Sequence, residues 1–468
     1  MNKKCQVFTP KDKVIELLDA AGYKQDLYGR KVIENACGDG SILKEIVRRY
    51  IKDSILQKRD GVEIKFGLEQ DIYGAEIDNK HYTNCIENLD EVANEFGIAN
   101  VKWNILNVDF LKCYEEGKYD FVIGNPPYIT YRELDEKTRA YLADKYESCE
   151  RGKFDYCYAF IEASIRSLKG DGHLAYLIPN SIFKNVYAKQ LRDMILPNMV
   201  KIIDYTTQKL FDKALTSSAI LVCQKGVNAM EFEYYDVVKE KKCKIDKSNL
   251  EEKWVFSEHK NEKKVKRRFG DYFKASISIA TLSNDVYIFK DYLEEDNFIV
   301  INDNRIEKCL VRKGVSPRSL NYQKEEMILF PYMYVNGNLK RFSVEDFEEK
   351  FPNAVEYLKV HFEKLDNRKA DGSVHWFEYG RTQALAHLNQ EKLLLSTVIT
   401  QTVKVYEIKE NQIPYSGIYV VPINNMPLSK AKKILESKDF LDYVKKIGIN
   451  ANGNSLRITV KDINNYMF

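Results

Sequence analysis

Two consecutive prolines limit how this chain can fold near residue 126. The tetrapeptide Asn125-Pro126-Pro127-Tyr128 follows a short apolar run, residues 119–124, which is typical of a buried strand ending at a glycine. Proline disfavours helix and cannot donate to a sheet ladder, so the strand must end in a rigid, open corner. Ligands of α/β proteins bind at the carboxyl ends of parallel strands. This corner is therefore a candidate binding site.

The corner offers two hydrogen-bond acceptors beside an aromatic ring. Asn125 supplies an amide oxygen, Pro126 a backbone carbonyl and Tyr128 the ring. These groups suit a flat nucleobase or an amide whose exocyclic amino group must be held by two acceptors and stacked. Taken alone, the tetrapeptide is also compatible with an ordinary proline-rich turn. What lies upstream makes that interpretation the weaker one.

A glycine-rich turn precedes the corner. An expected strand at residues 31–34 runs into Asn35-Ala-Cys-Gly-Asp-Gly40 and then into an amphipathic segment. Strand, glycine turn and helix form the opening unit of a nucleotide-binding α/β sheet. Glu76 lies near the end of a strand expected at 66–77, and Asp109 follows the next one. Either carboxylate alone would be an ordinary solvated charge, but together they predict a site for a ribose and an adenine amino group.

Strands and helices alternate as far as about residue 226, which predicts a Rossmann-like α/β fold with a mostly parallel sheet and helices on both faces. We assign this domain to residues 1–228 and a mixed α+β domain to residues 229–468. Beyond the elements above, the expected helices are 11–21, 41–51, 81–96 and 155–168, and the expected strands are 101–105, 121–123, 172–178, 200–205, 219–224 and 456–460.

The composition is that of an ordinary globular protein, with 468 residues, 44% hydrophobic and 30% charged. No apolar run approaches the length of a membrane span, and the first residues lack a signal-peptide core, so we expect a cytoplasmic protein with no membrane partner. The nine cysteines include no Cys-x-x-Cys pair, which predicts free thiols and no metal. With a net charge of +3, any nucleic-acid site must be a local patch.

The order of these motifs resembles the gamma class of adenine-N6 DNA methyltransferases. In that family the methyl-donor domain precedes a target-recognition domain, which is the order expected here. The resemblance covers about the first half of the chain and is looser in the second half, through Trp376–Arg381 and Gly453–Arg457. The matching segments are Phe8-Thr-Pro10, Glu34–Gly40, Glu76-Ile-Asp78, Asp109, Asn125–Tyr128, Ile178–Phe183, Leu191-Arg192 and Leu210–Ala214.

The resemblance implies S-adenosyl-L-methionine as methyl donor and a flipped-out adenine of double-stranded DNA as acceptor. Asn125 and Pro126 would hold the target amino group, Tyr128 would stack on the base, and Tyr187 would cover its other face. For Tyr187 and the alternative Phe183, the competing interpretation is that both rings belong to the core. Asn35 stands where the family usually has proline. The implied donor-binding residues are Thr9, Glu34, Cys37, Gly38, Glu76, Ile77, Asp109 and Pro127.

Several basic residues of the second half are candidates for DNA contact, although a solvated charged face is the common interpretation of such residues. The family implies a site-specific adenine DNA methyltransferase, EC 2.1.1.72, either the modification component of a restriction-modification system or a solitary enzyme. We expect a monomer of bacterial or phage origin, with any restriction endonuclease a separate protein. The candidate DNA-contact residues are Lys263, Lys264, Lys266, Arg267, Arg268, Arg381 and Arg457.

Other acceptors remain open at this point. Protein-glutamine N5 methyltransferases share the Asn-Pro-Pro-Tyr corner, because an amide nitrogen poses the same chemical problem, but they are shorter and carry a helical domain in front. RNA adenine methylation is a second alternative. A DNA-binding subunit without catalysis is a third, and the intact corner at residues 125–128 argues against it.

Overall fold

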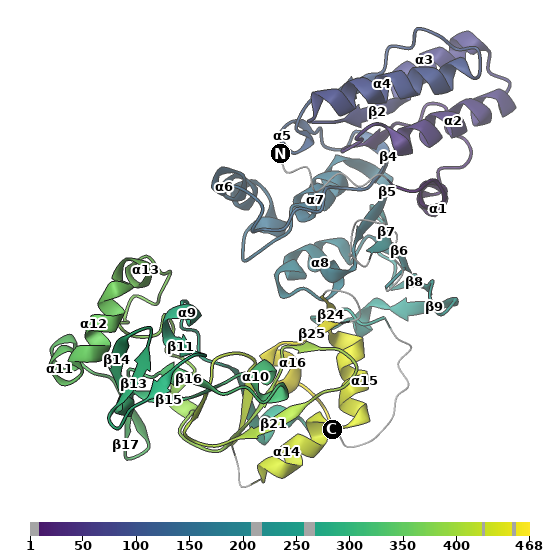
Figure 1. Cartoon of the computed structure of the whole chain (residues 1–468). Coiled ribbons are helices and arrows are strands. Elements are labelled where there is room, and N and C mark those ends of the chain that lie inside the picture. Colours follow the sequence, from purple (N-terminus) through teal and green to yellow (C-terminus); the bar gives the residue numbers. More distant parts are fainter. Residues whose placement is uncertain (1–8, 207–217, 257–266, 424–425, 452–454) are drawn as a thin grey trace. The chain divides into compact units, whose positions relative to one another are not determined.

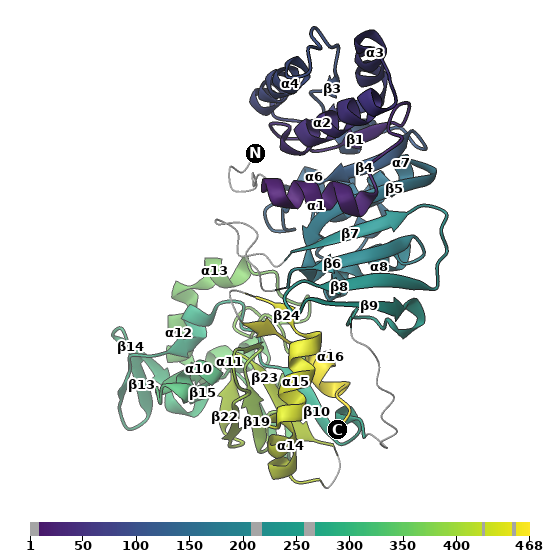
Figure 2. The same ribbon diagram turned by 90° about the vertical axis from the view of Figure 1, so that its right-hand side faces the viewer.

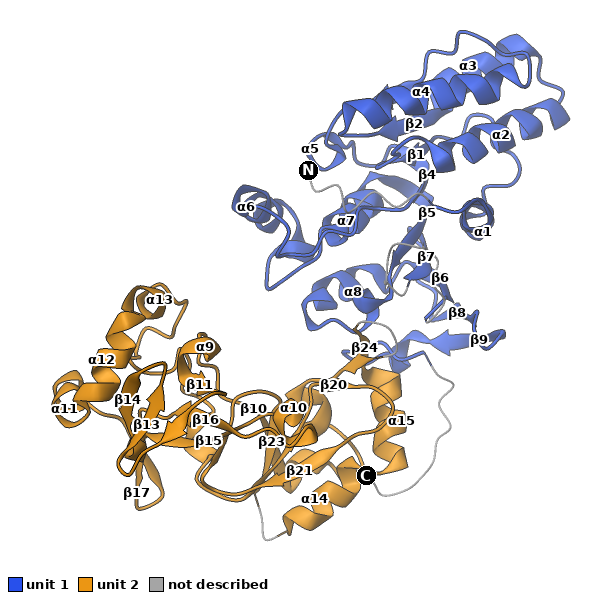
Figure 3. Cartoon of the chain, viewed as in Figure 1, with its two compact units in different colours: residues 1–261 blue, residues 262–468 orange. Residues whose placement is uncertain are grey.

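The computed structural model describes residues 9–206, 218–256, 267–423, 426–451 and 455–468 (Figure 1). The chain forms two compact units, residues 1–261 and 262–468 (Figure 3). This division falls later than the one expected after residue 228. The reason is a hairpin of two strands, β8 (Glu231–Asp236) and β9 (Lys241–Asp246), which joins the sheet of the first unit.

The first unit is built on one nine-stranded sheet with the order β3-β2-β1-β4-β5-β7-β6-β8-β9. The strands from β3 to β5 pair in parallel, whereas β7 is antiparallel to both of its neighbours and β8 pairs in parallel with β6. The strands are β1 (Val32–Glu34), β2 (Ile72–Ala75), β3 (Asn104–Leu106), β4 (Tyr119–Gly124), β5 (Leu168–Pro179), β6 (Met199–Asp204) and β7 (Ser218–Gln224).

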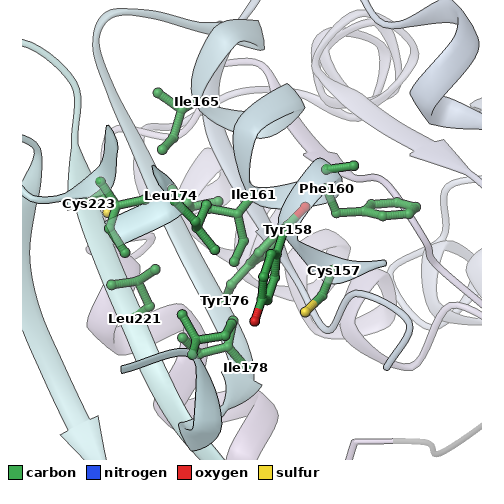
Figure 4. Close-up of a cluster of buried hydrophobic side chains, with 14 of the residues drawn as sticks. Cys157, Tyr158, Phe160, Ile161, Ile165, Leu174, Tyr176, Ile178, Leu221 and Cys223 are labelled. Atoms are coloured by element: carbon green, nitrogen blue, oxygen red, sulfur yellow. The ribbon is translucent and has the colours of Figure 1, made fainter. Parts of the chain in front are cut away.

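Helices cover both faces of this sheet, as the sequence predicted. Figure 2 shows α1 across β4, β5 and β7, the strands that it contacts. The other face carries α7, whose Tyr158 and Ile161 pack with Leu174 and Tyr176 of β5 (Figure 4). The helices are α1 (Lys11–Ala21), α2 (Ser41–Leu56), α3 (Gly61–Asp71), α4 (Asn79–Asn94), α5 (Phe110–Cys113), α6 (Glu136–Lys145), α7 (Cys157–Ser167) and α8 (Lys189–Ile195).

The first unit has two hydrophobic clusters, because side chains along a strand point alternately to the two faces of the sheet. Leu174 and Tyr176 of β5 lie in one hydrophobic cluster, and the intervening Ala175 lies in the other. Successive strand residues point to opposite faces, so a strand apolar on both faces must be covered twice. The near-continuous apolar run of β5 is therefore the signature of a central strand.

The prediction of a strand at residues 66–77 is wrong for the first half of that range. Residues up to Asp71 belong to helix α3, and only Ile72–Ala75 form the strand. The helix begins with a capping box, in which the Asp60 carboxylate accepts from the amides of Val62 and Glu63 and the Glu63 side chain returns a contact to the Asp60 amide. This local signal at the start of the helix favours α3 over the predicted strand.

The second unit mixes short helices with several small sheets, which confirms the expected α+β class. Two four-stranded sheets have the orders β10-β23-β19-β21 and β11-β16-β15-β22. Their strands are β10 (Phe273–Ile277), β23 (Ile418–Pro422), β19 (Lys392–Leu395), β21 (Val405–Ile408), β11 (Ile288–Phe289), β16 (Glu326–Leu329), β15 (Val311–Val315) and β22 (Gln412–Pro414).

Smaller elements complete the second unit. The strand expected at 456–460 is only partly present, because helix α16 starts at Val460 with Thr459 as its cap. The short strands are β12 (Leu293–Glu294), β13 (Phe298–Ile301), β14 (Asn304–Glu307), β17 (Met333–Val335), β18 (Asn338–Lys340), β20 (Val398–Ile399), β24 (Ile449–Asn450) and β25 (Leu456–Arg457). The helices are α9 (Asn284–Tyr287), α10 (Pro317–Asn321), α11 (Val344–Lys350), α12 (Pro352–Val360), α13 (Phe362–Asp366), α14 (Leu428–Leu435), α15 (Lys438–Ile447) and α16 (Val460–Asn464). Among the described residues, no helix has both the length and the apolar character needed to cross a bilayer.

Candidate functional site

A cavity of about 780 Å³ opens in the first unit where β1, β2, β3 and β4 end. Its volume lies within the range of small-ligand sites, roughly 300–1,000 Å³. All of the expected donor-binding residues line it, and Asn125 does so as well. The lining therefore includes Thr9, Glu34, Cys37, Gly38, Glu76, Ile77, Asp109, Asn125 and Pro127.

The glycine-rich turn takes its shape from two residues with positive φ, Gly38 at 54° and Gly40 at 82°. Gly40 is the residue before helix α2, and a Cβ atom there would lie 2.7 Å from the sulfur of Cys85. Only glycine satisfies both the left-handed conformation and this close approach. The turn can therefore bring its backbone to the edge of the cavity.

Glu76 joins the glycine turn to the end of β2. One carboxylate oxygen accepts from the Gly38 amide at 2.9 Å, and the other accepts from the Asp78 amide at 2.8 Å. Each oxygen of a carboxylate has a second lone-pair direction. The carboxylate is thus fixed in orientation while it can still accept two hydroxyl hydrogens from a ligand. Ile77, whose side chain is 46% exposed, offers an apolar surface beside it.

Glu34 is a buried carboxyl group, only 3% exposed, that accepts from the Leu43 amide at 3.1 Å. Burial raises its pKa well above the ordinary value, and the neighbouring Cys85 adds to the effect. For Cys37, a hydrogen bond with Cys85 followed by burial raises the pKa of the thiol. In this part of the cavity, burial and neighbouring acidic groups thus oppose the ionisation of both side chains.

Asp109 lies after β3 and caps helix α5, where one oxygen accepts from the Leu111 amide at 3.2 Å. Its other oxygen lies 3.3 Å from the ammonium of Lys112. Because these contacts leave acceptor capacity at the cavity wall, Asp109 can accept from an amino group.

The two ends of the Asn125 side-chain amide have different surroundings. Its nitrogen donates to the Thr9 hydroxyl at 3.2 Å, while its buried oxygen meets no hydrogen-bond donor within the described part of the chain. An unsatisfied buried acceptor costs about 1–3 kcal/mol. Asn125, a residue of the cavity lining, thus carries a buried acceptor without a donor among the described residues.

Pro126 and Tyr128 of the corner are not among the residues that line the cavity. Pro126 is buried. Tyr128 is half-buried, and its hydroxyl donates to the Leu177 carbonyl in β5 at 2.8 Å. That hydrogen bond fixes the ring beside the carboxyl end of the strand.

Tyr187 and Phe183 occupy different environments. Phe183 is fully buried and stacks on Trp254 with 6.1 Å between ring centroids, so it belongs to the core. Tyr187 is 43% exposed and lies against Gly152, where a Cβ atom would approach its ring to 2.2 Å. The interpretation that both rings are core is wrong for Tyr187. Its role in base stacking stays a prediction.

The sequence reasoning missed a polar network under the turn. The Asn35 amide nitrogen donates to the Ser164 hydroxyl at 2.9 Å, and its oxygen accepts from the Tyr176 hydroxyl. Ser164 and Tyr176 are themselves 2.6 Å apart. The departure from proline at position 35 therefore ties the turn to α7 and β5. In the sequence, the only sign of this network was a polar residue, Asn35, at a turn position where the family usually has proline.

Aromatic residues from the start of α7 were also missed. Tyr156 and Phe160 line the cavity, together with Phe110 and Ile129. The Tyr156 amide donates to the Ile129 carbonyl at 2.8 Å, which holds this segment next to the proline corner. The aromatic-rich run at 154–160 carried a weak signal, but nothing in its spacing indicated the cavity.

The candidate DNA-contact residues are only partly within the described part of the chain. Lys263, Lys264 and Lys266 lie outside the described residues. Arg268 donates to Asn465 at 2.7 Å, so its guanidinium is engaged within the unit. The exposed candidates whose side chains have no partner among the described residues are Arg267, Arg381 and Arg457.

Residues 42–211 match the family model described as Eco57I restriction-modification methylase. The match covers less than half of the chain, so it shows what this segment is similar to. The match confirms the resemblance to restriction-modification methyltransferases that the motifs suggested, and the methylase segment contains most of the cavity lining.

Two curated relatives resemble the chain to different extents. The type II restriction enzyme and methyltransferase RM.Eco57I of Escherichia coli is 25% identical over 61% of this chain, and the match covers 33% of that protein. The type II methyltransferase M.BstVI of Geobacillus stearothermophilus is 23% identical over 96% of this chain and 87% of that protein. The chain thus spans about a third of the first relative and most of the second.

A solved structure shares the fold of nearly the whole chain. The type IIL restriction-modification enzyme MmeI, in complex with DNA, aligns with 97% of this chain and 64% of its own at 15% identity and a TM-score of 0.62. The first unit accordingly has the Rossmann-like class I methyltransferase fold that the sequence predicted, with its cavity at the carboxyl ends of parallel strands.

Proposed function

We propose that this chain is a site-specific DNA methyltransferase that transfers the methyl group of S-adenosyl-L-methionine to N6 of an adenine in duplex DNA, EC 2.1.1.72. The family match and the type II methyltransferase M.BstVI support the general class. One observation carries the finer assignment: the buried Asn125 oxygen has no hydrogen-bond donor in the described structure, and Asn125 lines the cavity where a donor molecule fits.

The residues of the cavity fit S-adenosyl-L-methionine. When bound, this compound supplies an electrophilic methyl group on a sulfonium. Glu76 would accept the two ribose hydroxyls through the lone pairs that its backbone contacts leave free, and Ile77 would hold the adenine through apolar contact. Asp109 accepts from the adenine amino group. Glu34 and Cys37 would hold the charged part of the donor, whose positive charge would favour the ionised form of Glu34.

Asn125 and Pro126 act on the methyl acceptor. The lone pair of an adenine amino nitrogen is delocalised into the ring, so the nitrogen is a poor nucleophile. The Asn125 oxygen and the Pro126 carbonyl hold its two hydrogens, which favours a tetrahedral nitrogen with the lone pair directed toward the methyl group. This step needs positioning and preorganised acceptors more than a strong base. Pro127 contributes no N–H that could compete for the carbonyl.

The target base must leave the duplex to reach this corner. Tyr128 covers one face of the extruded base, and its ring is held in place through the bond from its hydroxyl to Leu177. Tyr187, exposed and supported by Gly152, covers the other face. The second unit, residues 262–468, selects the DNA sequence. The enzyme serves either as the modification component of a restriction-modification system or alone.

Identification of the product tests this proposal. The whole chain is incubated with tritiated donor in separate reactions. Each reaction contains one acceptor: duplex DNA, the same DNA after denaturation, an RNA pool or a protein extract. Nucleosides and amino acids are then resolved. We expect N6-methyladenine from duplex DNA. Label in RNA adenine, in glutamine, or in cytosine would contradict the assignment. Asn125→Ala should remove the signal.

A further inference from the structure

The second unit contains a polar cavity of about 390 Å³ that the proposed function does not use. It lies where the start of α10, the start of β16 and the connection from β22 to β23 come together. Its volume falls within the range of small-ligand sites, roughly 300–1,000 Å³. The lining is dominated by hydroxyl and basic side chains, so the cavity suits an anion rather than an apolar ligand.

Three basic side chains line this cavity, and none of them forms an ion pair with a carboxylate in the described part of the chain. Lys290, Arg318 and Lys324 are exposed lining residues, and none of their side chains has a hydrogen-bond or ion-pair partner in the part of the chain that the structure describes. The nearby Lys313 differs, because its ammonium lies 3.1 Å from the Glu325 carboxylate. Like charges at one site repel each other unless an anion lies between them.

The acidic side chain of the lining is already engaged. Glu326 is only 5% exposed and accepts a hydrogen bond from the Tyr415 hydroxyl. Three basic groups against one engaged carboxylate leave the cavity with a net positive lining. An anion at its mouth would therefore meet attraction that exceeds the repulsion from Glu326.

The hydroxyl groups at the base of the cavity are held in place. Ser316 accepts from the Ser319 amide at 3.0 Å, and the Ser319 hydroxyl accepts from the Ser316 amide at 2.9 Å. The Tyr415 hydroxyl lies 3.1 Å from that of Ser316. The Ser316 hydroxyl donates to that of Ser319, and the Ser319 hydroxyl donates to the Ser316 carbonyl, at 3.2 Å each. The hydroxyls of Thr397 and Ser416 remain in the lining as donors for a phosphate oxygen, since hydroxyl hydrogens rotate to suit an acceptor.

We propose that this cavity binds a phosphate group of the DNA backbone. The inference rests on the proposed function, which supplies duplex DNA as the polyanion, and it adds a contact that positions the DNA on the second unit. Lys290, Arg318 and Lys324 neutralise the phosphate, and the Thr397 and Ser416 hydroxyls donate to its oxygens. The volume exceeds what one phosphate needs and accommodates its sugar. Phosphate contacts fix register without reading sequence.

Salt dependence of DNA binding tests the proposal. The variants are the triple Lys290→Gln/Arg318→Gln/Lys324→Gln and the single Lys290→Gln and Lys324→Gln, and the control is Lys313→Gln, which removes a paired cation nearby. The DNA is a duplex that the wild-type enzyme methylates, compared with an unrelated duplex. Thermal unfolding and donor binding confirm that each variant is folded. These exposed cations make no contact whose loss would unfold the unit.

Loss of one phosphate contact should lower the slope of log K against log[salt] by about 0.9 for the triple variant, equally on both duplexes. The single variants should show part of this change, and Lys313→Gln should match the wild type. An unchanged slope in the triple variant, with methylation intact, would overturn the phosphate site and leave the proposed function standing. A wild-type protein that neither binds nor methylates DNA would overturn both.

Inorganic phosphate separates the two sources of this ligand. Calorimetric titration with phosphate measures binding to the wild type and to the triple variant. If phosphate binds the wild type and not the triple variant while their DNA-binding slopes agree, the cavity is a site for a free anion and the backbone proposal fails. If phosphate competes with DNA for the wild type alone, the proposal is supported.

Discussion

The amide nitrogen of Asn125 donates to the hydroxyl of Thr9, 3.2 Å away, across more than a hundred residues of sequence. This contact sets the orientation of the amide. With the nitrogen engaged, the buried oxygen is the atom left without a partner among the described residues. Thr9 thus acts as a positioning residue for Asn125 in addition to its expected contact with the methyl donor.

Glu76→Ala should weaken donor binding without unfolding the first unit. The carboxylate accepts from the Gly38 and Asp78 amides, and it is proposed to accept both ribose hydroxyls. Losing such charge-assisted bonds should cost about 1.5–3 kcal/mol of binding free energy. Calorimetry of donor binding measures the loss. Glu87→Gln on the exposed side of α4 is the control, and an unaltered dissociation constant for Glu76→Ala would place the donor elsewhere.

Glu34→Gln should change how stability depends on pH. Burial raises the pKa of Glu34, so the folded protein keeps this proton to higher pH than the unfolded chain does. Its contribution to stability is present below the unfolded pKa of about 4.3 and is lost as the pH rises toward the raised folded pKa. Glutamine stays neutral throughout. We therefore expect the variant to match the wild type in Tm at about pH 4 and below and to exceed it near pH 8.

Exposed Glu87→Gln is the matched control for that comparison, because it removes a carboxyl group of the same unit that lies at the surface. Equal slopes of Tm against pH for wild type and Glu34→Gln would show that Glu34 is ionised in the folded protein. A companion calorimetric experiment in buffers of different ionisation enthalpy should detect proton release when the cationic donor binds wild type and none with Glu34→Gln.

A fragment of residues 1–261 should fold and bind the donor, whereas one of residues 1–228 should not. The shorter fragment removes β8, which pairs with β6, and Trp254, which stacks on the buried Phe183. An unpaired β6 edge and an exposed aromatic core favour aggregation. Thermal unfolding and calorimetry of both fragments check this. Equal stability of the two fragments would show that the hairpin contributes nothing to the first unit.

Tyr128→Ala should slow methylation of duplex DNA more than Tyr128→Phe. Stacking of a base on an aromatic ring is worth about 1–3 kcal/mol, and only alanine removes the ring. Phenylalanine loses the bond from the hydroxyl to the Leu177 carbonyl, at a cost of about 0.5–1.5 kcal/mol, so we expect a modest decrease. Duplexes with 2-aminopurine at the target position report base extrusion by fluorescence. A dark probe with every variant, together with methylation of RNA alone, would refute base flipping from duplex DNA.

The sequence predicted the residues of the candidate site more completely than it predicted the helices and strands around it. Glu76 and Asn125 follow the ends of β2 and β4, so the local pattern placed them at one edge of the sheet, and the family resemblance added Glu34 at the end of β1. The helix at Gly61–Asp71 and the hairpin after Glu231 were missed or misplaced. A capping box favoured the helix over the predicted strand in the first case, and pairing across the sheet decided the second, which no local signal encodes.

Some features of the site depend on contacts between residues that are distant in the sequence, and these features could not be predicted from local patterns. Tyr187 and Phe183 are near neighbours in the chain with the same ring chemistry, yet one is exposed beside Gly152 and the other is buried against Trp254. The link from Asn35 to Tyr176 likewise joins residues from separate motifs. Such differences depend on tertiary packing.

Parallel measurement of methyl transfer and donor binding for Asn125→Ala tests the central claim most directly. Asn125 is assigned to the target amino group and not to the donor, so removal of this preorganised acceptor should lower the rate on the order of 100-fold or more while the dissociation constant of S-adenosyl-L-methionine hardly changes. Asn94→Ala, an exposed position at the end of α4, should behave as wild type in both assays. An Asn125→Ala variant that retains full activity would contradict the account.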